Sequence, residues 1–280
     1  MSNSENPIEK TIMFSTDLTA RCDRPMDRAC RLAKTLPAKL VICHVLEHGQ
    51  YGKEAVAAAT ADIEMHLASC EMDAEIIIQR GDIVAKIIET AESVGADLIV
   101  AGVARVGKLG DLVIGTPLER IIHHSPIPVL IVKNRAFTDY DLLVAATDFS
   151  APSAYAIKQA TQIFAGLPIH IVNAFHVPFE GFLHSDKLTE EFRTEQYLQM
   201  VKFVEQLRLT GSGAPKVSHI IEYGSTSTVV LDEIKDLNSN LTVIGTHGTG
   251  GFRANMIGSM ARSLIDYIPT DILAVRQKPK

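Results

Sequence analysis

Residues 11–20 read "TIMFSTDLTA", and residues 142–151 read "LLVAATDFSA". Each stretch is a short apolar run that ends in Thr-Asp, so that Asp148 in the second copy matches Asp17 in the first. Short runs that are apolar at nearly every position are typical of strands buried on both faces of a parallel sheet. The two stretches therefore predict equivalent first strands in two copies of one fold.

The repeat continues along the whole chain, which is the signature of a duplicated structural unit. The further matches are "LVICHVLE" (40–47) with "IHIVNAFH" (169–176), which places Val45 beside Ala174, "AEIIIQRGD" (74–82) with "VSHIIEYGS" (217–225), "ADLIVAG" (96–102) with "SNLTVIG" (239–245), and "IPVLIVK" (127–133) with "TDILAVR" (270–276). The sequence therefore predicts five strands in each half, with domains at 1–137 and 138–280.

Helical patterns lie between these strands, and "ANMIGSMARSLIDY" (254–267) is the last of them. Alternating strands and helices with right-handed crossovers predict two doubly wound α/β domains, each with a five-stranded parallel sheet. Ligands of such sheets bind beyond the carboxyl ends of the strands, where the winding reverses. We therefore expect the functional residues to follow the strands.

Composition restricts the class of protein. The chain has 280 residues, of which 46% are hydrophobic and 21% charged, and its net charge is −6. The negative charge argues against nucleic acid or an acidic membrane as a partner. The polar start "MSNSENPIEK" does not resemble a signal peptide, and no apolar run approaches the roughly 20 residues that cross a bilayer. We expect a cytoplasmic protein.

The four cysteines all lie in the first quarter of the chain, at Cys22, Cys30, Cys43 and Cys70. None forms a C-x-x-C pair, so the sequence does not predict a zinc site or a disulfide framework. Buried cysteines behave most often as small apolar residues, and no metal site is predicted.

Residues 245–259 read "GTHGTGGFRANMIGS" directly after an apolar run. Glycine permits positive φ angles and lets an anion approach backbone amides without a Cβ in the way. The start of the following helix adds further amide groups and a favourable dipole. The stretch fits neither G-x-x-x-x-G-K-[ST] nor G-x-G-x-x-G, and a plain glycine-rich turn is the alternative interpretation.

The spacing G-x2-G-x9-G-S, with an Asp after the first strand and a duplicated α/β unit, resembles the universal stress protein family in its tandem form. The resemblance implies adenine nucleotide hydrolase-like domains that bind ATP, ADP or AMP, with or without Mg²⁺. It implies a ligand set that comprises Asp148, Ala174, Gly245, Gly248, Gly258 and Ser259. We expect their neighbours Thr147, Thr249, Gly250, Gly251 and Arg253 to complete the binding site.

The first copy departs from this motif in "GVARVGKLGDLVIGT" (102–116). Gly102, Gly115 and Thr116 keep the frame, but Arg105 stands where the second copy has Gly248. Asp17 and Val45 are retained, so the adenosine half of a pocket is expected to survive. We predict a weakened or closed site in the first domain.

No pattern predicts a catalytic centre, because the chain lacks a Ser-His-Asp order or a paired carboxylate set. The leading interpretation is an ATP-binding stress-response regulatory protein that holds its nucleotide mainly in the second domain. A weak ATPase and a nucleotide-independent interaction scaffold are the alternatives.

The last strands of the two halves are apolar, and an uncovered edge of that kind favours pairing. The family resemblance implies that 128–132 and 271–275 face each other and join the two domains as a pseudo-dimer. Association of two chains into a homodimer is left open.

Overall fold

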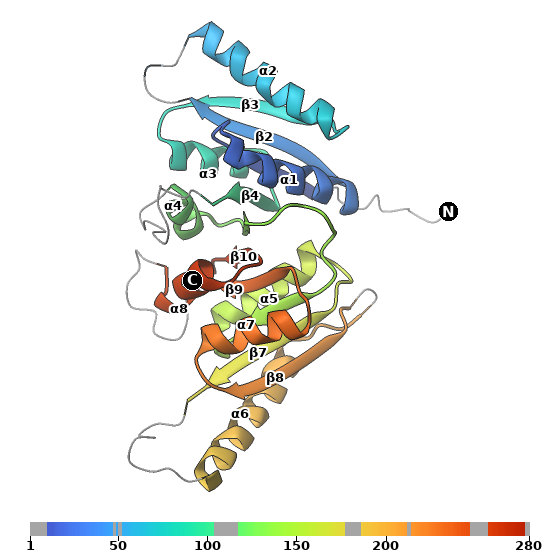
Figure 1. Ribbon diagram of the computed structural model, residues 1–280, viewed down its shortest axis with the longest axis vertical. Helices are drawn as coiled ribbons and strands as arrows, with labels where there is room; N and C mark the ends of the chain where they lie inside the picture. Colours follow the sequence, from blue (N-terminus) through green and yellow to red (C-terminus); the bar gives the residue numbers. More distant parts are fainter. Residues whose placement is uncertain are drawn as a thin grey trace, which may run out of the picture. The chain divides into compact units, whose positions relative to one another are not determined.

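The computed structural model describes residues 10–46, 49, 52–103, 117–176, 186–211, 214–246 and 257–277. The chain divides into two compact units. The first comprises Met1–Ile121 and Val129–Asp139, and the second comprises Ile122–Pro128 and Tyr140–Lys280. Strands and helices alternate in both units (Figure 1).

The described elements follow the predicted order. Those of the first half are β1 (Lys10–Thr16), a short 3-10 helix (Ala20–Cys22), α1 (Asp23–Thr35), β2 (Ala38–Leu46), α2 (Lys53–Ser69), β3 (Glu75–Arg80), α3 (Ile83–Ser93), β4 (Leu98–Gly102), α4 (Pro117–His124) and β5 (Val129–Val132). Those of the second half are β6 (Leu143–Ala146), α5 (Ala151–Ile163), β7 (Ile169–Phe175), α6 (Asp186–Leu207), β8 (Val217–Tyr223), α7 (Thr226–Asp236), β9 (Leu241–Gly245), α8 (Ser259–Tyr267) and β10 (Asp271–Val275).

Both units have the same sheet topology. The strand order is β3-β2-β1-β4-β5 in the first unit and β8-β7-β6-β9-β10 in the second, and neighbouring strands within each unit are parallel. The winding reverses between β1 and β4, and again between β6 and β9, which places the two expected binding crevices there. The predicted doubly wound α/β fold is confirmed. The pairing of 128–132 with 271–275 stays a prediction.

Burial separates β3 and β8 from the other strands. All residues of β5 and β10 are buried, and so are most residues of β1, β2, β4 and β9. The edge strand β3 has half-exposed residues throughout its apolar centre, and β8 is similar. The prediction that the strands are buried on both faces was therefore wrong for β3 and β8, each of which ends the strand order of its unit.

The last helix starts later than the helical pattern at 254–267 predicted. Gly258 precedes α8 with an extended backbone, at φ −56° and ψ 144°, and its amide donates to the Thr246 carbonyl at 2.9 Å. The helix therefore begins at Ser259, and Gly258 belongs to the loop that leads into it.

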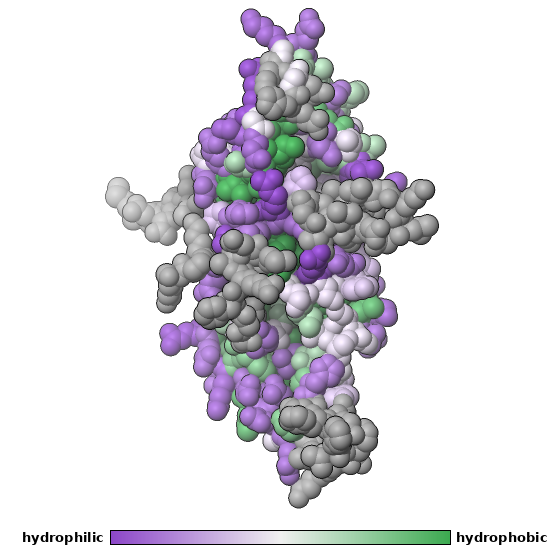
Figure 2. Space-filling view, turned by 90° about the vertical axis from the view of Figure 1, so that its left-hand side faces the viewer, coloured by the Kyte–Doolittle hydropathy of each residue, from purple (hydrophilic) through white to green (hydrophobic). Residues whose placement is uncertain are grey.

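Hydrophilic side chains cover much of the described surface on the face in Figure 2, with smaller apolar areas between them. Within the described ranges, no helix combines the length and hydropathy that a membrane span requires.

Candidate functional site

The loop after β6 is held in one conformation by its own side chains. Phe149 has a φ of 62°, which is unusual for a residue other than glycine. Its amide donates to the Thr147 hydroxyl at 2.9 Å, and the Ser150 amide donates to Asp148 Oδ1 at 3.1 Å. These two bonds stabilise the turn and orient the Asp148 carboxylate at the carboxyl end of the strand.

The backbone of Ala174 faces the space beyond the end of β6. The Thr147 amide donates to the Val172 carbonyl at 2.9 Å, and the Gly224 amide donates to the Phe175 carbonyl at 3.0 Å. Backbone groups of successive strand residues point to opposite neighbours, so Ala174 points to the same side as Val172. Since β6 ends at Ala146, the amide and carbonyl of Ala174 lie beyond its reach, at the edge of the sheet.

Asn173 ties these two strand ends together. Its Nδ2 donates to the Thr147 carbonyl at 2.9 Å, and its side chain is 5% exposed. The bond satisfies a carbonyl that lies past the last paired residue of β6, so it fixes the position of the loop relative to β7. Asn173 was not predicted from the sequence, although its place directly before Ala174 was a usable signal.

Gly245 lies where the first turn of α5 packs on the end of β9. A Cβ at this position would lie 3.2 Å from the carbonyl carbon and oxygen of Pro152 and 3.3 Å from the Ser153 amide nitrogen. The close approach that requires glycine is therefore an approach of the chain to itself. The sequence analysis assigned this glycine only to ligand contact.

The predicted positions of the second unit meet around one cavity of about 230 Å³ at the carboxyl edge of its sheet. Five of them line it: Thr147, Asp148, Ala174, Gly245 and Gly258. Ser259 starts α8, is exposed and is not part of the lining. Gly248, Thr249, Gly250, Gly251 and Arg253 lie outside the described residues.

Other lining residues were not predicted from the sequence. They are Ala146, Ser153, Asn173, Thr226, Ile244, Thr246, Met260, Ala261 and Leu264. Thr226 starts α7 after a Ser225 N-cap, so the rule that strand ends and the following helix starts meet at one edge was the signal for it. The larger apolar side chains come from β9 and α8 and form an apolar wall beside the polar loop that follows β6.

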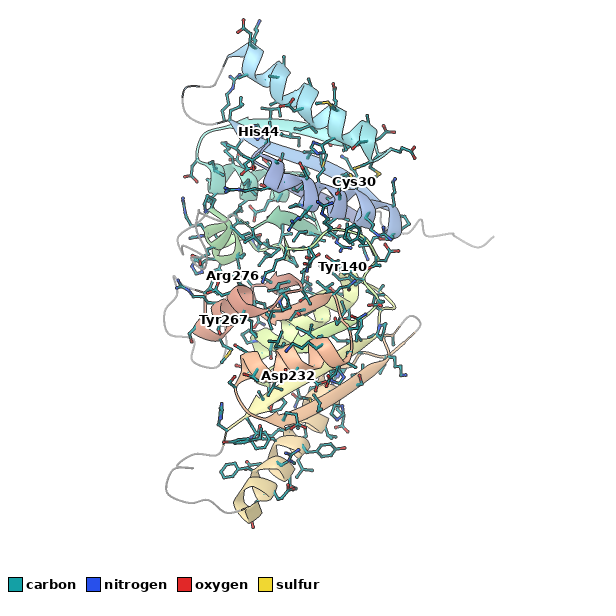
Figure 3. The ribbon with its side chains drawn as sticks, in the orientation of Figure 1. Cys30, His44, Tyr140, Asp232, Tyr267 and Arg276 are labelled. Carbon is teal, nitrogen blue, oxygen red and sulfur yellow. The ribbon has the colours of Figure 1, made fainter. Side chains whose placement is uncertain are left out.

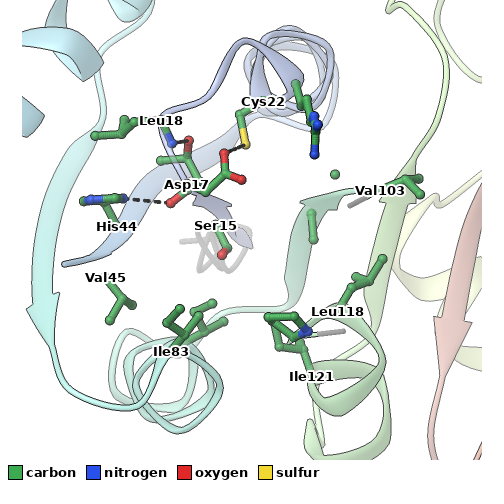
Figure 4. A pocket seen from close by; sticks show the side chains of 16 residues that line it. Ser15, Asp17, Leu18, Cys22, His44, Val45, Ile83, Val103, Leu118 and Ile121 are labelled. Carbon is green, nitrogen blue, oxygen red and sulfur yellow. Dashed lines mark hydrogen bonds between the residues drawn. The ribbon is translucent and has the colours of Figure 1, made fainter. Parts of the chain in front are cut away.

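The first unit repeats this arrangement (Figure 4). The Leu18 amide donates to the Thr16 hydroxyl at 3.0 Å, and Leu18 has a φ of 58°. His44 Nδ1 lies 2.9 Å from the Thr16 carbonyl, in the role that the Asn173 amide has in the second unit. The frame of the loop is therefore conserved within the chain although the residues differ.

A cavity of about 520 Å³ lies at this edge of the first unit. Asp17, Val45 and Gly102 line it as predicted, together with Ser15, Thr16, Leu18, Arg21, Cys22, His44, Ile83, Ile87, Ala101, Val103, Pro117, Leu118 and Ile121. Arg105, Gly115 and Thr116 lie outside the described residues. Gly102 again has a packing reason, because a Cβ there would lie 2.8 Å from Pro25 Cγ.

Asp17 accepts several hydrogen bonds from its own loop. Its Oδ1 accepts from the Thr19 amide at 2.9 Å, the Thr19 hydroxyl at 2.7 Å and the Cys22 thiol at 3.0 Å. Burial opposes the charged form, but these bonds outweigh it and lower the pKa of Asp17. Burial, and then the bond to Asp17, raises the pKa of Cys22 to about 11. The carboxylate is thus kept charged and the thiol protonated.

Metal ligands do not cluster in the part of the chain that the structure describes: no group of three or more His, Cys, Asp or Glu side chains is placed to hold an ion. The described lining of both cavities offers backbone groups, hydroxyls, one carboxylate each and an apolar wall, and the first cavity adds Arg21, Cys22 and His44.

Comparison with known proteins gives consistent matches. The family model described as "Universal stress protein family" matches residues 9–133 and again 139–276. Universal stress protein E of Photorhabdus laumondii is 26% identical over 64% of this chain, and the alignment spans 61% of that relative. A universal stress protein of Mycolicibacterium smegmatis is 23% identical over 98% of this chain and 99% of its own length. The crystal structure of a universal stress protein from Archaeoglobus fulgidus has the same fold, with a TM-score of 0.67, 19% identity and coverage of 96% of this chain and 98% of that one.

Proposed function

Because the chain belongs to the universal stress protein family, as two tandem copies, we propose that it is a stress-response regulatory protein that binds an adenine nucleotide. ATP is the proposed ligand, and the second domain, 138–280, is its main site. The family membership is the premise; the ligand and its place rest on the residues of the second unit.

The observation that supports this function most is the gathering of five predicted positions around one cavity at the carboxyl edge of the second sheet. They come from three strand ends and from the residue before α8. Residues so far apart in the sequence meet only because the fold brings strand ends together, at the edge where α/β sheets bind ligands. A glycine-rich turn without a ligand would not need the carboxylate and the free strand end beside it.

Each part of the site has a distinct role. The Ala174 amide and carbonyl recognise the adenine edge, and the Asp148 carboxylate accepts hydrogen bonds from ribose hydroxyls. The first turn of α8 offers amide groups that have no acceptor within the helix, together with the positive end of its dipole. The phosphates therefore lie over the start of α8, where Met260 and Ala261 line the cavity.

The volume of the second cavity agrees with a site that encloses the nucleoside and leaves the phosphates outside. At about 230 Å³ it is somewhat smaller than the roughly 300 Å³ at which ligand pockets usually begin. It is suited to the nucleoside, while the phosphates and a Mg²⁺ ion bind outside it, along the stretch that contains Gly248, Gly251 and Arg253.

The first domain, 1–137, keeps Asp17 and Val45 in its cavity but carries Arg105 at the position of Gly248. A Cβ and a long side chain then occupy the place where the second copy offers bare backbone. We expect this domain to bind ATP weakly or not at all.

Isothermal titration of the nucleotide-stripped chain with Mg-ATP tests the proposal through its stoichiometry. One site per chain is expected. Gly248→Arg gives the second domain the residue of the first and should abolish binding. The reciprocal change Arg105→Gly gives the first domain the residue of the second and should raise the stoichiometry toward two.

Three results contradict parts of the proposal. Full binding by Gly248→Arg would remove the second domain as the site. Two sites in the unaltered chain would show that Arg105 is tolerated. No binding of ATP, ADP or AMP would leave the glycine-rich stretch as a turn, and the scaffold hypothesis would then be favoured.

A further inference from the structure

Two contacts seat Cys70 against helix α1. Cys70 follows the last residue of α2, and its Sγ lies 3.9 Å from Asp27 Oδ1. The Lys34 ammonium donates to the Cys70 carbonyl at 2.7 Å. Asp27 and Lys34 lie one turn before and one turn after Cys30 on α1, so all three share one face of that helix. Cys70 therefore lies against the face of α1 that carries Cys30.

The two thiols differ in access. Cys30, labelled in Figure 3 on α1, is 3% exposed, whereas Cys70 is partly exposed. Burial is the main cause that raises the pKa of Cys30 well above its usual range, the Cys70 thiol and Asp27 raise it further, and Lys34 acts in the opposite direction. A reagent in solution thus meets Cys70 first, while Cys30 is held protonated behind it.

We propose that Cys70 and Cys30 form a two-thiol oxidation site, at which a small hydroperoxide is reduced and a reversible disulfide joins α1 to α2. This inference is independent of nucleotide binding. It assigns to the pair a chemistry that neither cysteine would have alone.

The reaction has two balanced steps. The Cys70 sulfur attacks one oxygen of hydrogen peroxide, an S–O bond forms, the O–O bond breaks, and water leaves with the thiol proton. The Cys30 sulfur then attacks the sulfur of the Cys70 sulfenic acid, so that the S–S bond forms and the S–O bond breaks. A second water leaves with the Cys30 proton. The two thiols lose two electrons, and the peroxide gains them.

The other two cysteines provide internal controls. The Cys22 thiol donates to the Asp17 carboxylate at 3.0 Å, and Cys43 is fully buried. Burial shields Cys43 from a reagent in solution, and burial together with the bond to Asp17 raises the pKa of Cys22 to about 11, so neither thiol is expected to react first. Because α1 starts directly after Cys22, which lines the first cavity, the disulfide restrains the helix that borders this cavity.

The test uses the full chain at low concentration, treated with hydrogen peroxide and then denatured, with free thiols alkylated and counted by mass spectrometry. The four labelled thiols of the reduced chain should fall to two, and dithiothreitol should restore all four. The oxidised chain should melt roughly 5–10 °C higher, because the disulfide closes a loop in the unfolded state. Cys70→Ser should lose the response, and the matched variant Cys22→Ser should still lose two labelled thiols.

Three outcomes would overturn the proposal. Oxidation of Cys70 to sulfinic acid with Cys30 still labelled would show that the buried thiol does not reach it. A disulfide between two chains would show that the exposed thiol reacts outward. Loss of labelled thiols in Cys70→Ser equal to that of the unaltered chain would assign the reaction to other cysteines.

Discussion

The loops after β1 and β6 have the same backbone but use different side chains to hold it. Leu18 and Phe149 both have left-handed φ angles, of 58° and 62°, and both amides donate to the threonine hydroxyl two residues before. That threonine is Thr16 in the first unit and Thr147 in the second. A backbone conformation is thus maintained across two copies because the hydrogen bond, and not the neighbouring side chain, determines it.

The side chains that line the two cavities differ more than this frame does. Cys22 in the first unit and Ser153 in the second occupy equivalent positions. The Cys22 thiol donates to Asp17, whereas the Ser153 hydroxyl bonds the Thr147 hydroxyl at 2.8 Å. Asp17 is thus engaged by an additional donor from its own loop. The cavity volumes differ as well, at about 520 Å³ in the first unit and about 230 Å³ in the second. The two copies therefore share the framework, and the linings of their cavities differ.

The largest expected effect concerns the glycines that end β4 and β9. Gly102→Ala and Gly245→Ala should each lower the free energy of unfolding by about 2–3 kcal/mol, because a Cβ meets a packed helix start in both units. Urea unfolding measures the loss. The two sites differ in what the Cβ meets: the ring of Pro25 in one, and main-chain atoms of Pro152 and Ser153 in the other.

That difference predicts which variant can be rescued. Pro25→Ala removes the ring atom 2.8 Å from the new Cβ, so it should restore most of the stability of Gly102→Ala. Pro152→Ala leaves the main chain in place and should not rescue Gly245→Ala. Equal rescue at both sites would contradict the contacts described here.

The glycines also show how far the sequence could predict the site. The repeat predicted the strands, their parallel order and the edge at which the candidate site residues gather, because apolar strand runs and the right-handed crossover rule determine these features. Gly245 was predicted as part of the site, but the atom that excludes a Cβ belongs to Pro152, on a helix nearly a hundred residues earlier. Such a contact depends on how α5 packs, which strand patterns do not specify.

Edge exposure and the role of Asn173 were missed for a related reason. The three isoleucines of β3 have the same pattern as a central strand, and only the strand order reveals that β3 is an edge. Asn173 lies in an apolar strand and gains its role from a carbonyl on β6. Both features depend on a neighbour that is distant in the sequence.

A smaller effect is expected at the residues that tie the second strand to the loop. His44→Ala and Asn173→Ala should each cost about 1–2 kcal/mol, because each leaves a threonine carbonyl without its side-chain donor. The exchange variants His44→Asn and Asn173→His give each unit the residue of the other and should cost less. Urea unfolding of the four variants tests the equivalence. A loss at only one of the two positions would show that the two side chains do not have the same role.

The smallest expected effect is a pH dependence of stability that only the second unit should show at this position, and it comes from His170. His170, 8% exposed on β7, lies between the Ser218 hydroxyl, 2.8 Å from Nδ1, and the Glu233 carboxylate, 3.1 Å from Nε2. The first unit has Val41 at the matching position, and it does not titrate. Burial lowers the pKa of His170, Glu233 opposes this shift, and His219 adds to it.

A histidine with a lowered pKa binds its proton more readily in the unfolded chain. The stability that it contributes is therefore complete above the unfolded value of about 6.5 and is lost as the pH falls from there toward the lower folded value. Melting temperatures between pH 7.5 and pH 5 should fall more steeply for the unaltered chain than for His170→Gln, which keeps polar atoms but carries no charge. Identical slopes would show that His170 does not contribute to the loss of stability in acid.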